Sequence, residues 1–296
     1  MPRFKLTAED IVLNVFCSLI GLFVIVATLY PILYMLVYSL NDPLDASKGG
    51  LFLFPRIFTL QNYGVVLSDA RLLQALVITV LRTVIGTIGT VLVTAMVAYA
   101  LSRDRLIFRR GYSLVAIITM YFNGGIIPFY LVLQNFGLLN SFWVYIIPQL
   151  FGVFNALLFM AFFRQMPREL EEAAKLDGAN DFQIFWRIAL PIAKPVVATV
   201  ALFVAVSHWN DWFTSAYFVA NQNLWTLPTI IIRLLSSVEA IDKMSSLPAT
   251  ARVDPMATLT SIKYATLIIS ILPITVLYPF VQRYFVKGMM VGSIKG

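Results

Sequence analysis

The residue types that most often perform catalysis are scarce in this sequence. Among 296 residues there is one histidine, His208, and one cysteine, Cys17. A single cysteine cannot form a disulfide within the chain, and a single histidine leaves little from which to build a metal centre or an acid–base pair. The sequence also lacks the Gly-x-x-x-x-Gly-Lys-[Ser/Thr] loop that cradles the phosphates of ATP. We therefore predict no catalytic residue, no metal site and no cofactor bound by this chain, and we do not expect an enzyme.

The stretch EEAAKLDGAN, from Glu171 to Asn180, has the residue types of a docking element. Its acidic first turn suits the start of a helix, where the helix dipole stabilises negative charge. Lys175 lies four residues after the first glutamate and is expected to pair with it. Ala173 and Ala174 favour a helix and leave room for the close approach of another surface. Gly178 can adopt the left-handed conformation that ends a helix.

A second short helix is expected directly after this glycine. Asn180 can cap its start, with Gln183 completing a capping box. Four apolar residues would share one face of it: Phe182, Phe185, Trp186 and Ala189. The segment could lie at a membrane interface with Trp186 among the lipid headgroups, or it could dock a cytoplasmic partner through its small alanines and acidic ridge. The residues alone leave both interpretations open.

A second set of polar and aromatic residues lies inside long apolar runs, where polar groups are costly and usually face the protein interior. Its members are Tyr121, Asn123, Asn155, His208, Trp209, Asn210, Asp211 and Trp212. Aromatic faces can pack against the C–H patches of sugars, and planar polar groups can hydrogen-bond to their hydroxyls. The set therefore suits a carbohydrate pathway, although helix–helix hydrogen bonding and aromatic packing explain the residue types at least as well.

Arg82 is the one basic residue well inside an apolar run. Its long side chain could extend toward the outer membrane surface. Alternatively it could pair with a carboxylate at a similar depth, for which Asp211 is a candidate.

The composition indicates that the bilayer is the solvent for most of these side chains. The chain is 59% hydrophobic and 12% charged, whereas a soluble domain is about a quarter charged. The net charge of +7 would suggest nucleic acid as the partner of a soluble protein. Here basic residues in cytoplasmic loops explain it better, and no nucleic-acid partner is expected.

Six apolar runs are long enough to cross a bilayer as helices, which needs about 20 residues. They cover residues 11–38, 74–101, 112–133, 142–163, 196–218 and 264–286. They lack the alternation of barrel strands, so we predict an all-α membrane protein of six transmembrane helices in a single domain, residues 1–296. The first run is too long for a signal peptide and is expected to remain as a span.

The basic residues predict the orientation of these spans. With both termini on the same side, the segments on that side contain fourteen Lys and Arg residues against seven in the longer segments opposite. Basic residues mark the cytoplasmic side, so both termini are expected in the cytoplasm. The loop 164–195 would then be cytoplasmic, and loops 41–71 and 219–263 would be extracytoplasmic.

The docking stretch resembles the EAA motif of the membrane subunits of ATP-binding cassette (ABC) importers. The motif reads here as Glu172-Ala173-Ala174, three residues, Gly178, nine residues, Ile188, one residue, and Leu190-Pro191. It lies between the fourth and fifth predicted spans, which is its place in that family. The resemblance implies the type I ABC importer permease fold.

Other segments resemble the carbohydrate subgroup of these permeases. They are Tyr30-Pro31, Phe58 to Tyr63, Trp209-Asn210-Asp211 and Phe285 to Gly288. The segments from Asn123 to Pro128 and from Gly137 to Ser141 are similar to a branch linked to the uptake of oligosaccharides or polysaccharide fragments. A permease for a non-sugar solute that carries the same loop is the alternative.

The resemblance also implies partners and a location. A second permease subunit, usually a different chain, would complete the pathway in a bacterial cytoplasmic membrane. Two ATPase subunits would bind ATP and Mg, and an extracytoplasmic solute-binding protein would deliver the carbohydrate.

The residues that the resemblance assigns to coupling with the ATPase are Glu172, Ala173, Ala174, Asp177, Gly178, Leu190 and Pro191. Glu172 would make polar contacts, the two alanines would pack tightly, and Leu190-Pro191 would direct the loop back into the membrane. The tail 287–296 would be either a polar end or a segment that reaches the ATPase interface.

Overall fold

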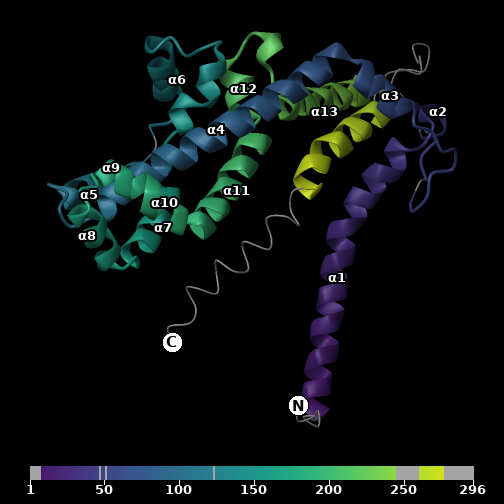
Figure 1. Cartoon of the computed structure of the whole chain (residues 1–296). Helices are drawn as coiled ribbons and strands as arrows, with labels where there is room; N and C mark the ends of the chain where they lie inside the picture. Colours follow the sequence, from purple (N-terminus) through teal and green to yellow (C-terminus); the bar gives the residue numbers. More distant parts are fainter. Residues whose placement is uncertain (1–7, 47, 51, 123, 245–259, 277–296) are drawn as a thin grey trace. The chain divides into compact units, whose positions relative to one another are not determined.

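The computed structural model describes residues 8–46, 48–50, 52–122, 124–244 and 260–276 (Figure 1). They belong to two compact units. Unit 1 comprises Met1–Asp69 and Leu234–Ile271, and unit 2 comprises Ala70–Arg233 and Leu272–Gly296. Every regular element in the described part of the chain is a helix, which confirms the predicted all-α class.

Unit 1 begins with the apolar helix α1 (Ala8–Ser39) and continues through α2 (Pro43–Ala46) and α3 (Gln61–Ser68). The segment between α2 and α3 is ordered by buried polar groups. Asn62 Nδ2 donates to the carbonyls of Ser39 and Asn41, each at 2.9 Å. Asp45 accepts hydrogen bonds from Asn41 and from Arg56, and these two bonds lower the pKa of its carboxyl group. The start of the predicted outer loop 41–71 therefore packs on itself.

Unit 2 is built around one long helix, α4 (Ala70–Ser102), which packs against α7 and α11. Its other elements, in chain order, are α5 (Arg109–Tyr121), α6 (Ile126–Asn135), η1 (Phe142–Tyr145), η2 (Ile147–Gln149), α7 (Val153–Arg164), α8 (Arg168–Leu176), α9 (Asp181–Ile184), the π-helical turn η3 (Phe185–Ala189), α10 (Leu190–Ile192), α11 (Lys194–Asn210), α12 (Phe213–Phe218) and η4 (Gln222–Leu224). Helix α13 (Leu227–Met244) follows, and the last described helical segment is Thr260–Val276.

In the part of the chain that the structure describes, two helices are long and apolar enough to span a bilayer by themselves, Glu9–Ser39 and Ala70–Ser102. Among the described residues the number rises to five if each of three bent helix pairs is counted as one span. The predicted run 264–286 is described only as far as residue 276. Six spans, the single domain and the orientation of the termini stay predictions.

The predicted runs 142–163 and 196–218 each contain more than one helix. In the first, η1–η2 meets α7 at 45°, and the residue that precedes α7, Gly152, is extended, with ψ 117°. In the second, α11 ends at Asn210 and Asp211 is extended, with ψ 104°. The run 112–133 likewise divides into α5 and α6, and Gly125 precedes α6 with φ 86°, a conformation that glycine adopts without strain.

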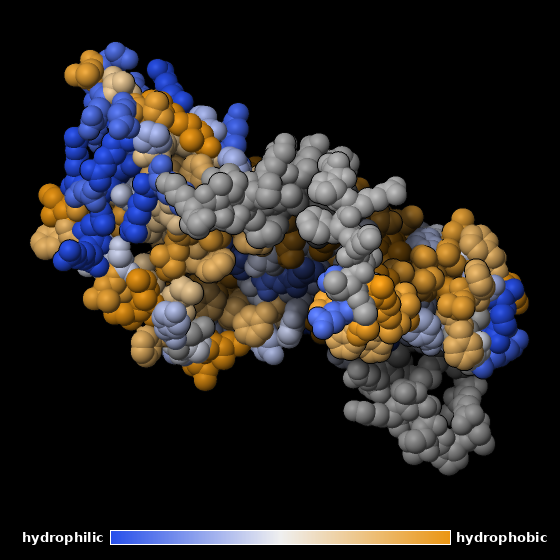
Figure 2. Space-filling view, turned by 90° about the horizontal axis from the view of Figure 1, so that it is seen from below, coloured by the Kyte–Doolittle hydropathy of each residue, from blue (hydrophilic) through white to orange (hydrophobic). Residues whose placement is uncertain are grey.

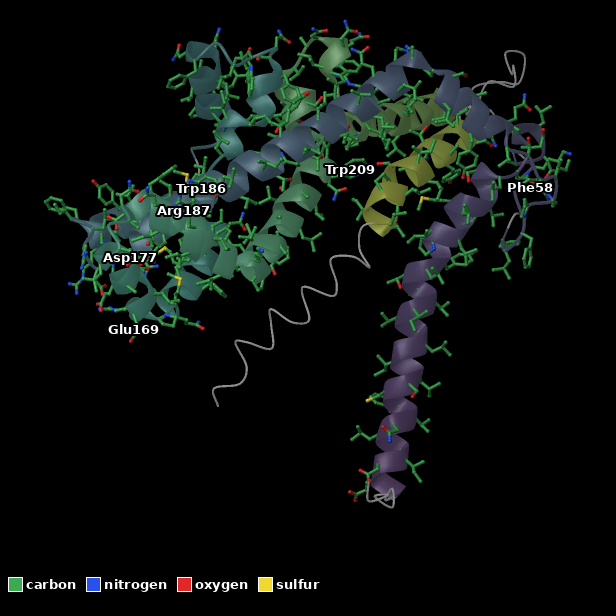
Figure 3. All side chains as sticks on the ribbon, in the orientation of Figure 1. Phe58, Glu169, Asp177, Trp186, Arg187 and Trp209 are labelled. Carbon is green, nitrogen blue, oxygen red and sulfur yellow. The ribbon has the colours of Figure 1, made fainter. Side chains whose placement is uncertain are left out.

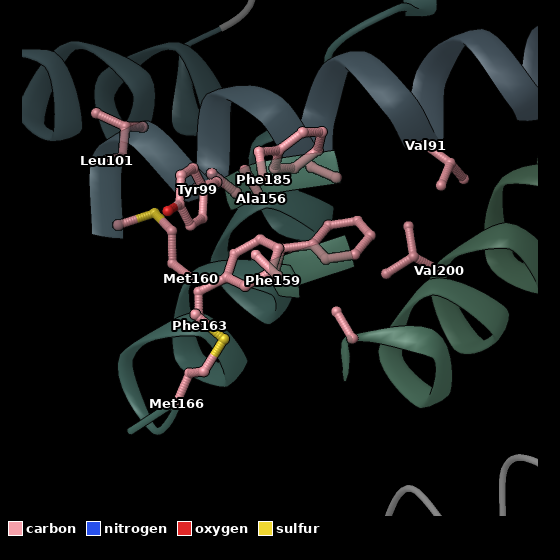
Figure 4. Packing of buried hydrophobic residues seen from close by; sticks show 14 of the residues in the cluster. Val91, Tyr99, Leu101, Ala156, Phe159, Met160, Phe163, Met166, Phe185 and Val200 are labelled. Atoms are coloured by element: carbon pink, nitrogen blue, oxygen red, sulfur yellow. The ribbon is translucent and has the colours of Figure 1, made fainter. Parts of the chain in front are cut away.

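The core of unit 2 joins α4, α7 and α11 to the segment after α8 (Figure 4). Phe159 and Phe163 stack with ring centroids 5.9 Å apart, and Tyr99 meets Phe163 edge-on at 5.5 Å. Phe185 of the π-helical turn also lies 5.5 Å from the Tyr99 ring. In a bilayer such packing, rather than the removal of water, stabilises helix contacts. The segment 184–193 is thus an integral part of the core.

Candidate functional site

Helix α8 ends in a sharp turn at Gly178, as the sequence predicted. Gly178 has φ 82°. Its N–H donates to the Lys175 carbonyl at 3.0 Å, and the Ala179 N–H donates to the Ala174 carbonyl at 2.9 Å. These two bonds form a Schellman motif, which satisfies the last carbonyls of the helix and needs a left-handed residue at this position.

The predicted capping box at the start of α9 is also confirmed. The Gln183 N–H donates to Asn180 Oδ1 at 2.8 Å, and the Asn180 N–H donates to Gln183 Oε1 at 3.0 Å. Two adjacent caps therefore fix the angle between α8 and α9 through local chemistry.

The coupling residues divide between an exposed face and the core. Glu172, Ala173, Asp177, Gly178 and Pro191 are exposed, whereas Ala174 and Leu190 are half-buried and pack against the core of unit 2. Figure 3 shows Glu169, Asp177, Trp186 and Arg187 at the same end of this unit.

The shared apolar face predicted for α9 is wrong. Phe185 and Ala189 are buried in the core, whereas Phe182 is 60% exposed and Trp186 is 38% exposed. Residues 185–189 form a π-helical turn, whose wider spacing rotates side chains away from α-helical positions. Leu176, 89% exposed, adds to the apolar surface outside the core.

Ion pairs join α8 to the loop that follows α4 and to the start of α9. Arg103 Nη2 lies 2.5 Å from Glu171 Oε1, and the Arg103 guanidinium sits 4.4 Å from the centroid of the Tyr99 ring. Lys175 pairs with Asp181 at 2.8 Å. The predicted Glu171–Lys175 pair is therefore wrong, because each residue has a different partner.

Asp104 makes a second link to α8. Arg168 Nη2 lies 2.5 Å from its carboxylate, which also pairs with Arg109. The hydrogen bond from Arg109 and the charge of Arg168 lower the pKa of the Asp104 carboxyl group. Exposed pairs contribute little individually, but together these contacts hold α8 against the loop that follows α4.

A cavity of about 720 Å³ lies between α8 and the end of α4. Five arginines line it: Arg103, Arg105, Arg109, Arg164 and Arg168. Figure 2 shows hydrophilic residues gathered at the end of unit 2 where α5 and α8 lie, as expected of a surface in contact with water.

The extended residue Asp211 is the centre of a buried polar network. Arg82 Nη2 donates to Asp211 Oδ2 at 2.6 Å, and Arg82 Nη1 donates to the Asp211 carbonyl at 2.9 Å. Thr214 donates to the same carboxylate through its hydroxyl at 2.6 Å and its N–H at 3.1 Å. Gln149 Nε2 adds a longer bond of 3.4 Å.

Of the two explanations offered for Arg82, the structure supports the ion pair with Asp211. The Arg82 side chain is 0% exposed and lies over the Tyr145 ring at 4.4 Å, and the Tyr145 hydroxyl donates to the Leu224 carbonyl at 2.7 Å. The network joins α4, η1, η2 and the start of α12, so it stabilises the break in the predicted fifth span. Sequence reasoning did not identify Gln149 or Thr214, because nothing in their local sequence marks a partner so distant along the chain.

The other residues predicted to line a carbohydrate pathway do not form one cluster. His208 and Trp209 are buried, Asn155 is half-buried, and Asn210, Trp212 and Tyr121 are exposed. Asn123 lies outside the described residues. His208 and Asn155 both line a second cavity, of about 420 Å³. Tyr121 ends α5 and is not among the residues that line it. Within the described ranges no group of His, Cys, Asp and Glu could bind a metal ion.

In its described part the chain is all-helical, with two helices long and apolar enough to span a bilayer and a capped helix turn on its surface, as expected of a membrane transport subunit. The chain belongs to the family of binding-protein-dependent transport system inner membrane components, which it matches over residues 10–291. This is a family of transport components rather than enzymes.

Two curated relatives and one solved structure extend this likeness. Protein LplC of Bacillus subtilis (strain 168) is 37% identical over 269 residues, which cover 91% of this chain and 90% of that protein. The polygalacturonan/rhamnogalacturonan transport system permease protein YtcP of the same organism is 33% identical over 266 residues, or 90% of this chain and 92% of that protein. The solved structure is of a bacterial ABC transporter involved in the import of the acidic polysaccharide alginate. It has a TM-score of 0.85 and 28% identity, and covers 96% of this chain and 100% of that chain.

Proposed function

We propose that this chain is a pathway-forming subunit of an ATP-driven importer of carbohydrate, with oligosaccharides as the substrate class. Family membership and the likeness to a polygalacturonan/rhamnogalacturonan permease and to an alginate importer support the proposal. The chain would cross a bacterial cytoplasmic membrane six times, with both termini in the cytoplasm. The alternative is a permease of the same family for a solute other than sugar.

The observation that carries the coupling part of the proposal is the fixed geometry of α8. Its exposed face presents Glu172, Ala173 and Asp177, whereas Ala174 on the other face packs against the core. A partner seated on the exposed face would meet a small alanine, a negative charge and the turn at Gly178. An ATPase subunit is the proposed partner.

The rigid connection from α8 to the core supplies a mechanism. Glu171 joins α8 to Arg103 at the end of α4, and Phe185 and Ala189 anchor the next segment in the core. Motion of the ATPase subunits would therefore move α8 together with α4, α7 and α11 rather than bend a loose loop. ATP binding and release would bias two arrangements of the helices, open inward and open outward.

The complete transporter would contain several further subunits. Two ATPase subunits would bind ATP and Mg, a second permease subunit of a different chain would form the other half of the pathway, and an extracytoplasmic solute-binding protein would deliver the sugar. The pathway candidates Asn155, His208 and Trp209 would belong to the surface along which the sugar passes.

ATP hydrolysis by the complete complex in proteoliposomes tests this function. The complex should hydrolyse ATP faster when its binding protein is loaded with an oligosaccharide than when it is empty. Glu172→Lys should abolish the stimulation, because it reverses a negative charge on the exposed face of α8. Glu9→Lys, in the first turn of α1, should not abolish it. Stimulation by a phosphate, polyamine or amino acid, with none by any oligosaccharide, would favour the non-sugar permease.

A further inference from the structure

The ends of three apolar helices meet at the cavity of about 720 Å³ between α8 and the end of α4. Arg103 directly follows α4, Arg109 is the first residue of α5, and Arg164 is the last residue of α7. Helices α4, α5 and α7 contact one another. Each arginine lies at the boundary of a predicted span, where the hydrocarbon of a bilayer gives way to its headgroups. The cavity is therefore expected at the level of the headgroups of the cytoplasmic leaflet.

The lining of this cavity has an excess of positive charge. Six basic and four acidic side chains line it. Asp104 is shared by two arginines, Arg109 and Arg168. Two further lining arginines, Arg105 and Arg164, are exposed and form no ion pair within the described residues. Their guanidinium groups are accessible to an anion that is not part of this chain.

The kind of anion follows from the rest of the lining. A guanidinium group presents a planar fork of donors that matches the oxygens of a phosphate. Apolar side chains also line the cavity, among them Met96, Leu106 and Phe182. A free phosphate gains nothing from an apolar wall, whereas a phospholipid has glycerol and acyl chains next to its phosphate.

The loop between α4 and α5 has the character of a segment at a membrane surface. It places Ile107 and Phe108, which are 75% and 80% exposed, beside the arginines. Basic residues next to exposed apolar ones are typical of segments that lie in the interface plane. In that plane the apolar side chains would contact acyl chains, and the arginines would face the anionic headgroups of the cytoplasmic leaflet.

We propose that this cavity binds the headgroup phosphate of an anionic phospholipid, with Arg105 and Arg164 as its main ligands. Basic pockets between membrane helices on the cytoplasmic side are known to bind such headgroups. The site goes beyond the proposed function, because neither sugar nor ATP takes part. A headgroup held there would contact α8, the helix through which the ATPase is proposed to act.

Photocross-linking of the complete complex in nanodiscs tests the site. The discs contain equal parts of phosphatidylcholine and a phosphatidylglycerol that carries a photoreactive group at the glycerol end of one acyl chain. Peptide mass spectrometry should find lipid adducts on residues 96–109 of the wild type. The double substitution Arg105→Ala with Arg164→Ala should lower their yield about tenfold, because two of the cations that attract the headgroup are lost. Both positions are exposed, so the variant has little risk of misfolding.

Arg187→Ala is the matched control. Arg187 is an exposed arginine at the same end of unit 2 (Figure 3) and does not line the cavity, so the yield should be unchanged. Equal yields from the wild type and the double variant would overturn the site, as would an equal yield from photoreactive phosphatidylcholine.

Two further measurements distinguish other occupants of the cavity. An excess of inorganic phosphate should leave the adducts in place, and their loss would assign the cavity to free phosphate instead of a lipid. If the double variant keeps its adducts but loses the ATPase subunits, the cavity binds an acidic surface of the ATPase, and the lipid site is wrong. The test needs no sugar and no ATP hydrolysis, so its failure would leave the proposed carbohydrate function untouched.

Discussion

Gly178→Asp is expected to uncouple ATP hydrolysis from transport while the complex still assembles in the membrane. Gly178 has φ 82°, where a residue with a Cβ atom is strained by roughly 1–2 kcal/mol. Apart from its chain neighbours, no atom of the described residues lies within 4 Å of its ideal Cβ position, so the turn has room for a Cβ atom. The added carboxylate would project from the turn and stand at the negative end of α8, where it is unfavourable. Sugar uptake should fall by about a hundredfold, equivalent to about 2.8 kcal/mol of coupling free energy.

Gly137→Asp is a closely matched control for this change. Gly137 has φ 65° with open space around it, and it ends α6 with the same pair of hydrogen bonds that Gly178 makes after α8. The substitution imposes the same backbone strain on the opposite side of the predicted topology, so uptake should remain near normal. Uptake and ATP hydrolysis in proteoliposomes measure both variants. Equal losses from the two would mean that strain alone explains the effect, and normal uptake by Gly178→Asp would refute the coupling role.

Asp211→Ala is expected to destabilise unit 2 by about 3–5 kcal/mol. The substitution leaves the Arg82 guanidinium buried without its carboxylate and removes the acceptor of the Thr214 hydrogen bonds. The loss of a buried counter-ion is among the largest effects of single substitutions. Thermal unfolding of the purified complex should reveal it as a clear drop in the unfolding temperature.

Two further variants isolate the cause of that loss. Asp177→Ala removes an exposed carboxylate and should change stability little. The double substitution Arg82→Met with Asp211→Leu removes both charges, and should be more stable than Asp211→Ala alone, because no buried charge remains unpaired. If Asp211→Ala is no less stable than Asp177→Ala, the ion pair does not stabilise the break between α11 and α12.

The features that the sequence predicted best depend on a few neighbouring residues. The left-handed glycine at the end of α8 and the capping box of Asn180 and Gln183 are both visible within one helical turn. Their physical basis is local, so no knowledge of the tertiary structure was needed. The all-α class followed equally directly from the apolar composition.

The features that the sequence predicted poorly depend on contacts between distant segments. Glu171 was expected to pair with Lys175 on its own helix, but Arg103 lies closer in space. The partner of Arg82 is 129 residues away, so depth in the membrane could suggest Asp211 but could not establish the contact. The prediction of a shared apolar face on α9 was wrong for another reason. It assumed the α-helical period, whereas residues 185–189 form a π-helical turn.

Cross-linking at the exposed face of α8 tests the central claim most directly. Cys17 is exposed, and Cys17→Ser removes the one native thiol of the chain. On that background, Ala173→Cys in the complete complex should cross-link to an ATPase subunit through a short thiol-to-amine reagent, with a yield that changes when ATP binds. Phe136→Cys, also exposed but on the opposite side of the predicted topology, should give no such product. The absence of an ATPase adduct from Ala173→Cys, or an equal yield from Phe136→Cys, would contradict the claim that ATP energy enters the chain through α8.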